Sequence, residues 1–161
     1  MGLATEHYSR DSHMISPGGS TFNEQENIDL VKKLYEAFGK GDIKTILAHL
    51  SDDVTWSSPS PATIPYSGDR TGPAEVREFF NQLVGTQENV NLTISQFIAQ
   101  GEAVATLGRY SGNVKPTRKP FNSVIGHFFT IRDGKVTRWT GLGDTAHAAA
   151  AYSRASAAAA E

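Results

Sequence analysis

The sequence predicts an α+β fold in which three helices pack on one face of a curved antiparallel sheet and a further helix ends the chain. Apolar residues recur at helical spacing within residues 28–38, 43–50 and 76–83, and from residue 90 to residue 142 they mostly alternate with polar ones. Asp133-Gly134 is a strong β-hairpin signal, because both turn positions require a positive φ. Between such a sheet and its helices we expect a pocket.

The first two helices are predicted from helical spacing and from residues typical of helix ends. Apolar side chains recur between Ile28 and Phe38, and Gly39 and Gly41 end that helix. Asp42 is then placed to cap a short second helix over residues 43–50.

A strand and a third helix follow. Residues 53–58 alternate and predict a strand, which Pro59 and Pro61 end. A polar loop is expected up to residue 71. Gly72-Pro73 then opens the third helix, since proline is favoured in the first turn.

Four strands are expected next, as two hairpins in an antiparallel meander. The first hairpin joins residues 90–99 to residues 103–111 through Gly101-Glu102. The second joins residues 121–132 to residues 135–142 through Asp133-Gly134.

The two ends of the chain differ from the middle. Residues 1–22 carry few large apolar side chains, and we interpret them as a disordered leader or an expression remnant. Residues 23–152 form the predicted domain, and residues 153–161 an alanine-rich tail. Alanine favours helix, so residues 146–160 predict a helix that frays outward.

The composition argues against several classes of protein. With 15 Lys plus Arg against 17 Asp plus Glu, the chain lacks the basic excess of a nucleic-acid binder. It has no cysteine, no metal-ligand spacing of histidines and carboxylates, and no apolar run near the ~20 residues of a membrane span. We expect a cytoplasmic single domain with no cofactor, metal, nucleic-acid partner or membrane partner.

Three motifs and the order of the elements resemble one known superfamily. Gly41-Asp42 follows the first helix, Asp52-Asp53-Val54 leads into Trp56, and Asp133-Gly134-Lys135-Val136 precedes Trp139. This arrangement resembles the nuclear transport factor two-like superfamily, in its SnoaL-like and ketosteroid isomerase-like branch, over roughly residues 23–152. The resemblance implies a cone-shaped roll and a homodimer through the outer sheet face. It does not fix an activity, because the fold hosts isomerases, epoxide hydrolases, dehydratases, cyclases and non-catalytic domains.

Two active sites known in this superfamily lack their acids here. Steroid isomerases of this fold use a tyrosine, an aspartate base and a protonated aspartate, whose positions match Leu34, Ser58 and Gly126. Limonene epoxide hydrolases use an arginine between two acids, whose positions match Arg109, Ser111 and Gly141. We therefore expect neither steroid isomerisation nor that type of epoxide hydrolysis.

The same alignments, combined with strand alternation, predict the ligand-contacting residues. They place on the concave face Trp56, Ser58, Arg109, Ser111, Phe128, Trp139 and Gly141, with Tyr35 and Tyr66 as further hydrogen-bond partners. His127 is expected on the outer face. Arg109 would hold a bound anion, or else pair internally with Asp144 or Asp69.

Asp144 allows a structural and a catalytic interpretation. It precedes the alanine-rich helix and is well placed as its N-cap, the role that we prefer. It also matches the acid–base residue of SnoaL-type polyketide cyclases.

The functional hypothesis is a SnoaL-like protein that encloses a small aromatic or enolisable, anionic ligand. Its chemistry would be cofactor-independent cyclisation, isomerisation or dehydration, with Asp144 moving protons and Arg109 stabilising negative charge. The alternative is a non-catalytic ligand-binding or dimerisation module.

Overall fold

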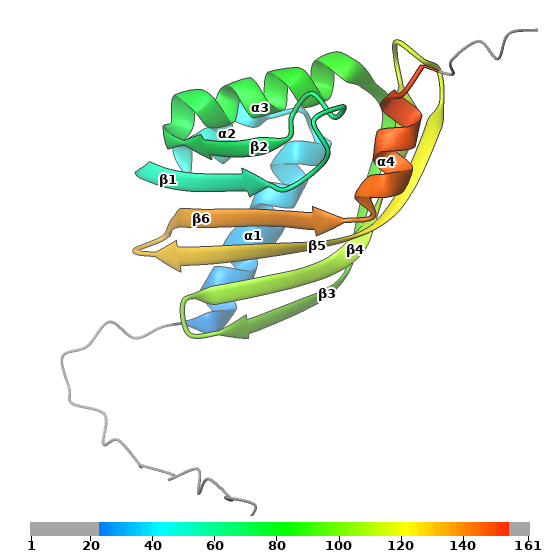
Figure 1. Cartoon of the computed structure of the whole chain (residues 1–161). Coiled ribbons are helices and arrows are strands. Elements are labelled where there is room, and N and C mark those ends of the chain that lie inside the picture. Colours follow the sequence, from blue (N-terminus) through cyan, green and yellow to red (C-terminus); the bar gives the residue numbers. More distant parts are fainter. Residues whose placement is uncertain (1–22, 155–161) are drawn as a thin grey trace, which may run out of the picture.

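The computed structural model describes residues 23–154 and confirms the α+β class: helices pack on one face of a curved sheet (Figure 1). The predicted leader, residues 1–22, and the tail beyond residue 154 lie outside the described residues. None of the described helices is long and apolar enough to cross a membrane.

The second and third helices begin at the residues that the sequence indicates. In α1 (Glu24–Gly39) the N-cap is Asn23, and in α2 (Ile43–Ala48) it is Asp42, whose carboxylate accepts a hydrogen bond from the Thr45 backbone N–H at 3.1 Å. This confirms the predicted cap. The third helix, α3 (Gly72–Thr86), has proline in its first turn, as expected.

Six strands form one sheet in the order β2-β1-β6-β5-β4-β3. Their bounds are Leu50–Ser58 for β1, Gly68–Thr71 for β2, Gln87–Gln100 for β3, Ala103–Val114 for β4, Pro120–Arg132 for β5 and Lys135–Gly143 for β6. The fully antiparallel expectation is wrong at one place, because β1 pairs parallel to β6. The sheet is therefore mixed.

The expectation of a loop throughout residues 59–71 is also wrong. Strand β2 pairs antiparallel to β1, and the Ser57 hydroxyl donates to the Asp69 carboxylate at 2.7 Å across this pair. A four-residue strand that begins Gly-Asp has low β propensity, so its pairing with β1 had no local signal.

A β-bulge in β6 sets which side chains of the meander face inward. Near the turn Ile131 pairs with Val136, but the next pair is Thr130 with Arg138, so Thr137 is an extra residue. Val136 and Trp139 are consequently both buried although they lie three residues apart. The bulge also places Phe129, rather than Phe128, opposite Trp139.

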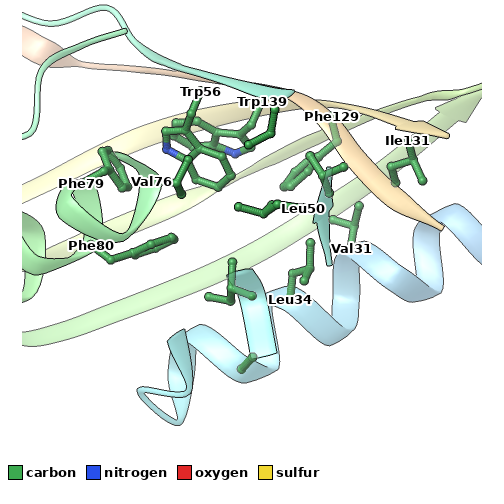
Figure 2. Close-up of a cluster of buried hydrophobic side chains, with 14 of the residues drawn as sticks. Val31, Leu34, Leu50, Trp56, Val76, Phe79, Phe80, Phe129, Ile131 and Trp139 are labelled. Atoms are coloured by element: carbon green, nitrogen blue, oxygen red, sulfur yellow. The ribbon is translucent and has the colours of Figure 1, made fainter. Parts of the chain in front are cut away.

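The core lies between the concave sheet face and helices α1 and α3. Figure 2 shows Val31 and Leu34 of α1 facing Val76, Phe79 and Phe80 of α3, with the aromatic side chains of β1, β5 and β6 behind them. All five of these helix residues are buried, which explains the helical spacing of apolar residues in the sequence.

The last helix, α4 (Thr145–Tyr152), lies across one end of the sheet (Figure 1). Asp144 caps it, with its carboxylate accepting from the His147 backbone N–H at 3.2 Å. The structural interpretation of Asp144 is thus confirmed. At the other end of α4, Ala151 is buried and Tyr152 packs against the same small cluster.

Candidate functional site

A cavity lies between the concave face of the sheet, helices α1 and α3, and the first turns of α4. It encloses about 160 Å³. Its walls are mostly apolar and aromatic, and among residues 23–154 they include no lysine and no arginine. Such a cavity favours uncharged, largely apolar ligands, because an ion loses its hydration there without gaining a counter-ion.

Two tryptophans form one wall of the cavity. Trp56 and Trp139 are register partners across the parallel β1–β6 pair, and their rings stack with centroids 4.2 Å apart and planes 18° apart. The Trp139 ring lies over Gly141: a Cβ atom there would be 2.3 Å from the indole. Gly141 therefore gives Trp139 room to lie flat on the sheet.

A polar cluster interrupts the apolar wall where α1 faces β4 and β5. The Tyr35 hydroxyl lies 2.7 Å from Thr106 Oγ1 and 2.9 Å from His127 Nδ1. The His127 ring packs edge-on against Trp139, with centroids 5.0 Å apart. Loss of hydration lowers the pKa of His127 to about 4 and raises the pKa of Tyr35. Both groups are therefore uncharged at neutral pH.

A second polar cluster surrounds Gln87 at the start of β3. This buried amide donates through Nε2 to the hydroxyls of Tyr66 and Tyr152, at 3.2 and 3.0 Å, and accepts from Tyr110 through Oε1. The Tyr152 hydroxyl also contacts Thr86 Oγ1 at 2.8 Å. Tyr66 and Tyr110 line the cavity, so the cluster ties the end of α4 to its wall.

Short polar side chains border the part of the cavity beneath α4. Ser58 is buried and lies 3.3 Å from Ser60 Oγ, and the Ser123 hydroxyl donates to the Asp144 backbone carbonyl at 3.2 Å. Asp144 and Ala148 contribute to the same lining. Asp144 is exposed to solvent.

Comparison with known proteins identifies the family. A SnoaL-like domain model matches residues 31–139, more than half of the chain. The chain belongs to the SnoaL-like family. No curated protein matched it.

Solved structures agree with this assignment. An NTF2-like protein from Burkholderia xenovorans LB400 is 30% identical, with a TM-score of 0.72, over 82% of this chain and 99% of that chain. A putative polyketide cyclase from Xanthomonas campestris pv. campestris is 26% identical, with a TM-score of 0.70, over 81% and 99%. TerC, co-crystallized with polyporic acid, is 26% identical, with a TM-score of 0.71, over 79% and 98%.

Seven of the predicted ligand-contacting or catalytic residues of this SnoaL-like domain line its cavity. They are Tyr35, Trp56, Ser58, Tyr66, Trp139, Gly141 and Asp144.

The predicted positions of Arg109, Ser111 and Phe128 are wrong. Arg109 is exposed on the outer face, where it donates to the Asn122 side-chain oxygen at 3.0 Å, and neither Asp144 nor Asp69 pairs with it. Phe128 is 50% exposed, and Ser111 is outside the lining. On β4 and β5 the inward residues are the neighbours of those expected from the family alignment. The bulge at Thr137 of β6 brings Phe129 rather than Phe128 opposite the inward-facing Trp139, so the other face of β5 and of its partner β4 points inward.

The same reversal brings in residues that the sequence analysis missed. His127 lines the cavity instead of the outer face, with Thr106 behind it. The position beside Gly126 therefore carries a polar side chain that lines the cavity. One signal was available: Val136 and Trp139, two large apolar residues three apart in a strand, indicate a bulge.

Burial of neutral His127 predicts an acid-sensitive stability. The unfolded histidine takes up a proton near pH 6.5 but the folded one only near pH 4, so the free energy of unfolding should fall as the pH drops from about 6.5 to 4. The loss should be about 3 kcal/mol, measured by urea unfolding at a series of pH values.

His127→Gln should lack this part of the pH dependence, whereas His49→Gln, a matched change on α2's C-terminal side, should retain it. Equal pH slopes in wild type and His127→Gln would contradict the proposed burial of the neutral ring.

Proposed function

We propose that this SnoaL-like protein binds a small, planar, uncharged aromatic or enolisable molecule in the cavity, against the Trp56–Trp139 stack. The observation that carries the proposal is an aromatic cavity to whose lining the described part of the chain contributes no lysine or arginine. The sequence analysis expected an anionic ligand bound by Arg109. The structure does not support this expectation, because Arg109 is exposed on the outer face of the sheet and does not line the cavity. Structural relatives described as a putative polyketide cyclase and as TerC with polyporic acid support a small-molecule ligand.

Binding can be tested with two probes that share a naphthalene ring. Neutral 2-acetylnaphthalene should raise the melting temperature, whereas anionic 2-naphthoate should bind at least roughly tenfold more weakly, because no cation compensates its lost hydration. The expected site is tested with Ala148→Trp, which places a large side chain in the cavity and should abolish the rise in melting temperature.

Ala146→Trp is the matched control, since Ala146 is exposed on the same helix and outside the lining. Tighter binding of naphthoate, or binding that survives Ala148→Trp, would contradict the proposed site.

Within this cavity we propose acid–base chemistry without a cofactor, with Asp144 as the base that removes a proton from an enolisable ligand. Support comes from its position in the cavity lining, together with its access to solvent for returning the proton. One oxygen of the carboxylate holds the helix cap, so the group is also held in place.

Proton exchange at the methyl group of 2-acetylnaphthalene in D2O, followed by NMR, tests this role. Asp144→Asn keeps a good N-cap but removes the base, so exchange should slow by roughly 10²-fold or more. Asp42→Asn makes the same change at the cap of α2, away from the cavity, and should leave exchange unchanged. Binding without wild-type exchange would favour the non-catalytic module.

We also propose that the outer face of the sheet pairs with a second copy of the chain. On this face Leu107 of β4, Gly126 of β5 and Leu142 of β6 are register partners. Four large apolar side chains around them are 43–50% exposed: Leu107, Val124, Phe128 and Leu142. Removal of such a patch from water stabilises association.

Light scattering after size-exclusion chromatography tests the dimer. The wild type should have twice the mass of one chain, and Leu107→Glu should have the mass of one chain, because a buried carboxylate opposes pairing. Val84→Glu, at an exposed apolar position on α3, should remain dimeric. A monomeric wild type would disprove the proposal.

A further inference from the structure

Tyr35, Thr106 and His127 form a hydrogen-bonded cluster in which the direction of one hydrogen bond fixes the direction of the other. Tyr35 has one hydrogen and lies within reach of both partners, at 2.7 Å from Thr106 Oγ1 and 2.9 Å from His127 Nδ1. Thr106 is buried, and its hydroxyl has no other hydrogen-bond partner in the described residues. The direction of the two bonds is therefore coupled.

Two directions are possible along this chain of groups. In the first, Thr106 donates to Tyr35 and Tyr35 donates to His127 Nδ1, so the histidine proton is on Nε2. In the second, His127 donates from Nδ1 to Tyr35 and Tyr35 donates to Thr106, which leaves the buried Thr106 hydrogen without an acceptor. A buried donor without an acceptor is costly, so the first direction is favoured.

The second ring nitrogen of His127, Nε2, takes part in no hydrogen bond with the described residues. Within residues 23–154, the side-chain nitrogen and oxygen atoms that are both fully buried and unpartnered are Ser51 Oγ and Trp56 Nε1. His127 Nε2 is also without a hydrogen bond to the described residues, but it is not one of these two fully buried atoms, so it is accessible. Because His127 belongs to the cavity lining, we infer that Nε2 is accessible from the cavity.

We propose that His127 is a catalytic residue that presents an Nε2–H donor to a carbonyl oxygen of the ligand, with Tyr35 and Thr106 as positioning residues that fix its tautomer. The ligand class is then a planar ketone or related carbonyl compound, oriented with its oxygen toward α1 and its ring along the Trp56–Trp139 wall. This inference rests on the proposed function, because it requires that the cavity bind the ligand.

A neutral imidazole suits this role chemically. A hydrogen bond from Nε2–H draws electron density toward the carbonyl oxygen and stabilises the negative charge that develops there as the α-proton leaves for the base. The groups that face His127 are Tyr35, Thr106, Phe129 and Trp139, none of which carries a charge at neutral pH. The donor therefore acts in surroundings where water and ions compete little.

A comparison of two ligands in two proteins isolates the hydrogen bond. The ligands are 2-acetylnaphthalene and 2-ethylnaphthalene, which differ in the carbonyl group, and the proteins are the wild type and His127→Phe. We expect the ratio of ketone affinity to hydrocarbon affinity to fall roughly fivefold to tenfold in His127→Phe, the size of one net hydrogen bond. His127→Gln, which keeps an N–H donor, should recover part of the ratio.

The infrared carbonyl band of bound 2-acetylnaphthalene gives a readout that a purely structural role would not move. In the wild type the band of the bound ketone should lie at lower frequency than the band of the free ketone in an apolar solvent, and this shift should be lost in His127→Phe. An unchanged affinity ratio and an unshifted band, with both naphthalenes still bound, would overturn the inference while the proposed function stands.

Nitrogen-15 NMR of the free protein tests the tautomer without any ligand. His127 should be mostly protonated on Nε2, and its signal is assigned by its disappearance in His127→Phe. A majority of the Nδ1–H form would overturn the assignment, whether or not a naphthalene binds. If neither naphthalene binds the wild type, the proposed function fails, and the carbonyl role of His127 fails with it.

Discussion

The stack of Trp56 on Trp139 is the contact on which the rest of the molecule depends. It joins β1 to β6, and so connects the N-terminal helices and the β1–β2 pair to the C-terminal meander. Two local features permit it: the bulge at Thr137 turns Trp139 inward, and Gly141 leaves space for its ring. The same two rings pack in the core against Phe79 and Phe80 of α3 (Figure 2), and they also form a wall of the cavity.

Because core and cavity share these rings, the chemistry of the site is set by burial. The polar groups near the rings are held neutral: loss of hydration lowers the pKa of His127 and raises the pKa values of Tyr35 and Tyr66. The charged group of the lining is Asp144, at the solvent-exposed N-terminus of α4. An electrically neutral interior with one carboxylate near solvent suits the binding of an uncharged molecule and the removal of a proton from it.

Local patterns predicted most of the elements, but not how strands meet. Helix starts at Asp42 and Gly72-Pro73, the Asp133-Gly134 turn and the Asp144 cap follow from residues within a few positions of one another. The parallel β1–β6 pairing is decided by tertiary packing, which a single sequence does not display, and the local sign of the bulge is the three-residue spacing of Val136 and Trp139. The family alignment and strand alternation placed Arg109 and Phe128 inside and His127 outside. The inserted residue in β6 offsets the neighbouring strands by one residue relative to Trp139, so the opposite side chains of β4 and β5 face inward.

The position of a bound planar ketone can be measured by intermolecular nuclear Overhauser effects between 2-acetylnaphthalene and assigned side chains. We expect contacts from the naphthalene ring to the Trp139 indole, and from the acetyl methyl group to the His127 ring. Contacts to Leu107 and Phe128 instead would place the ligand on the outer face of the sheet and would disprove binding in the cavity.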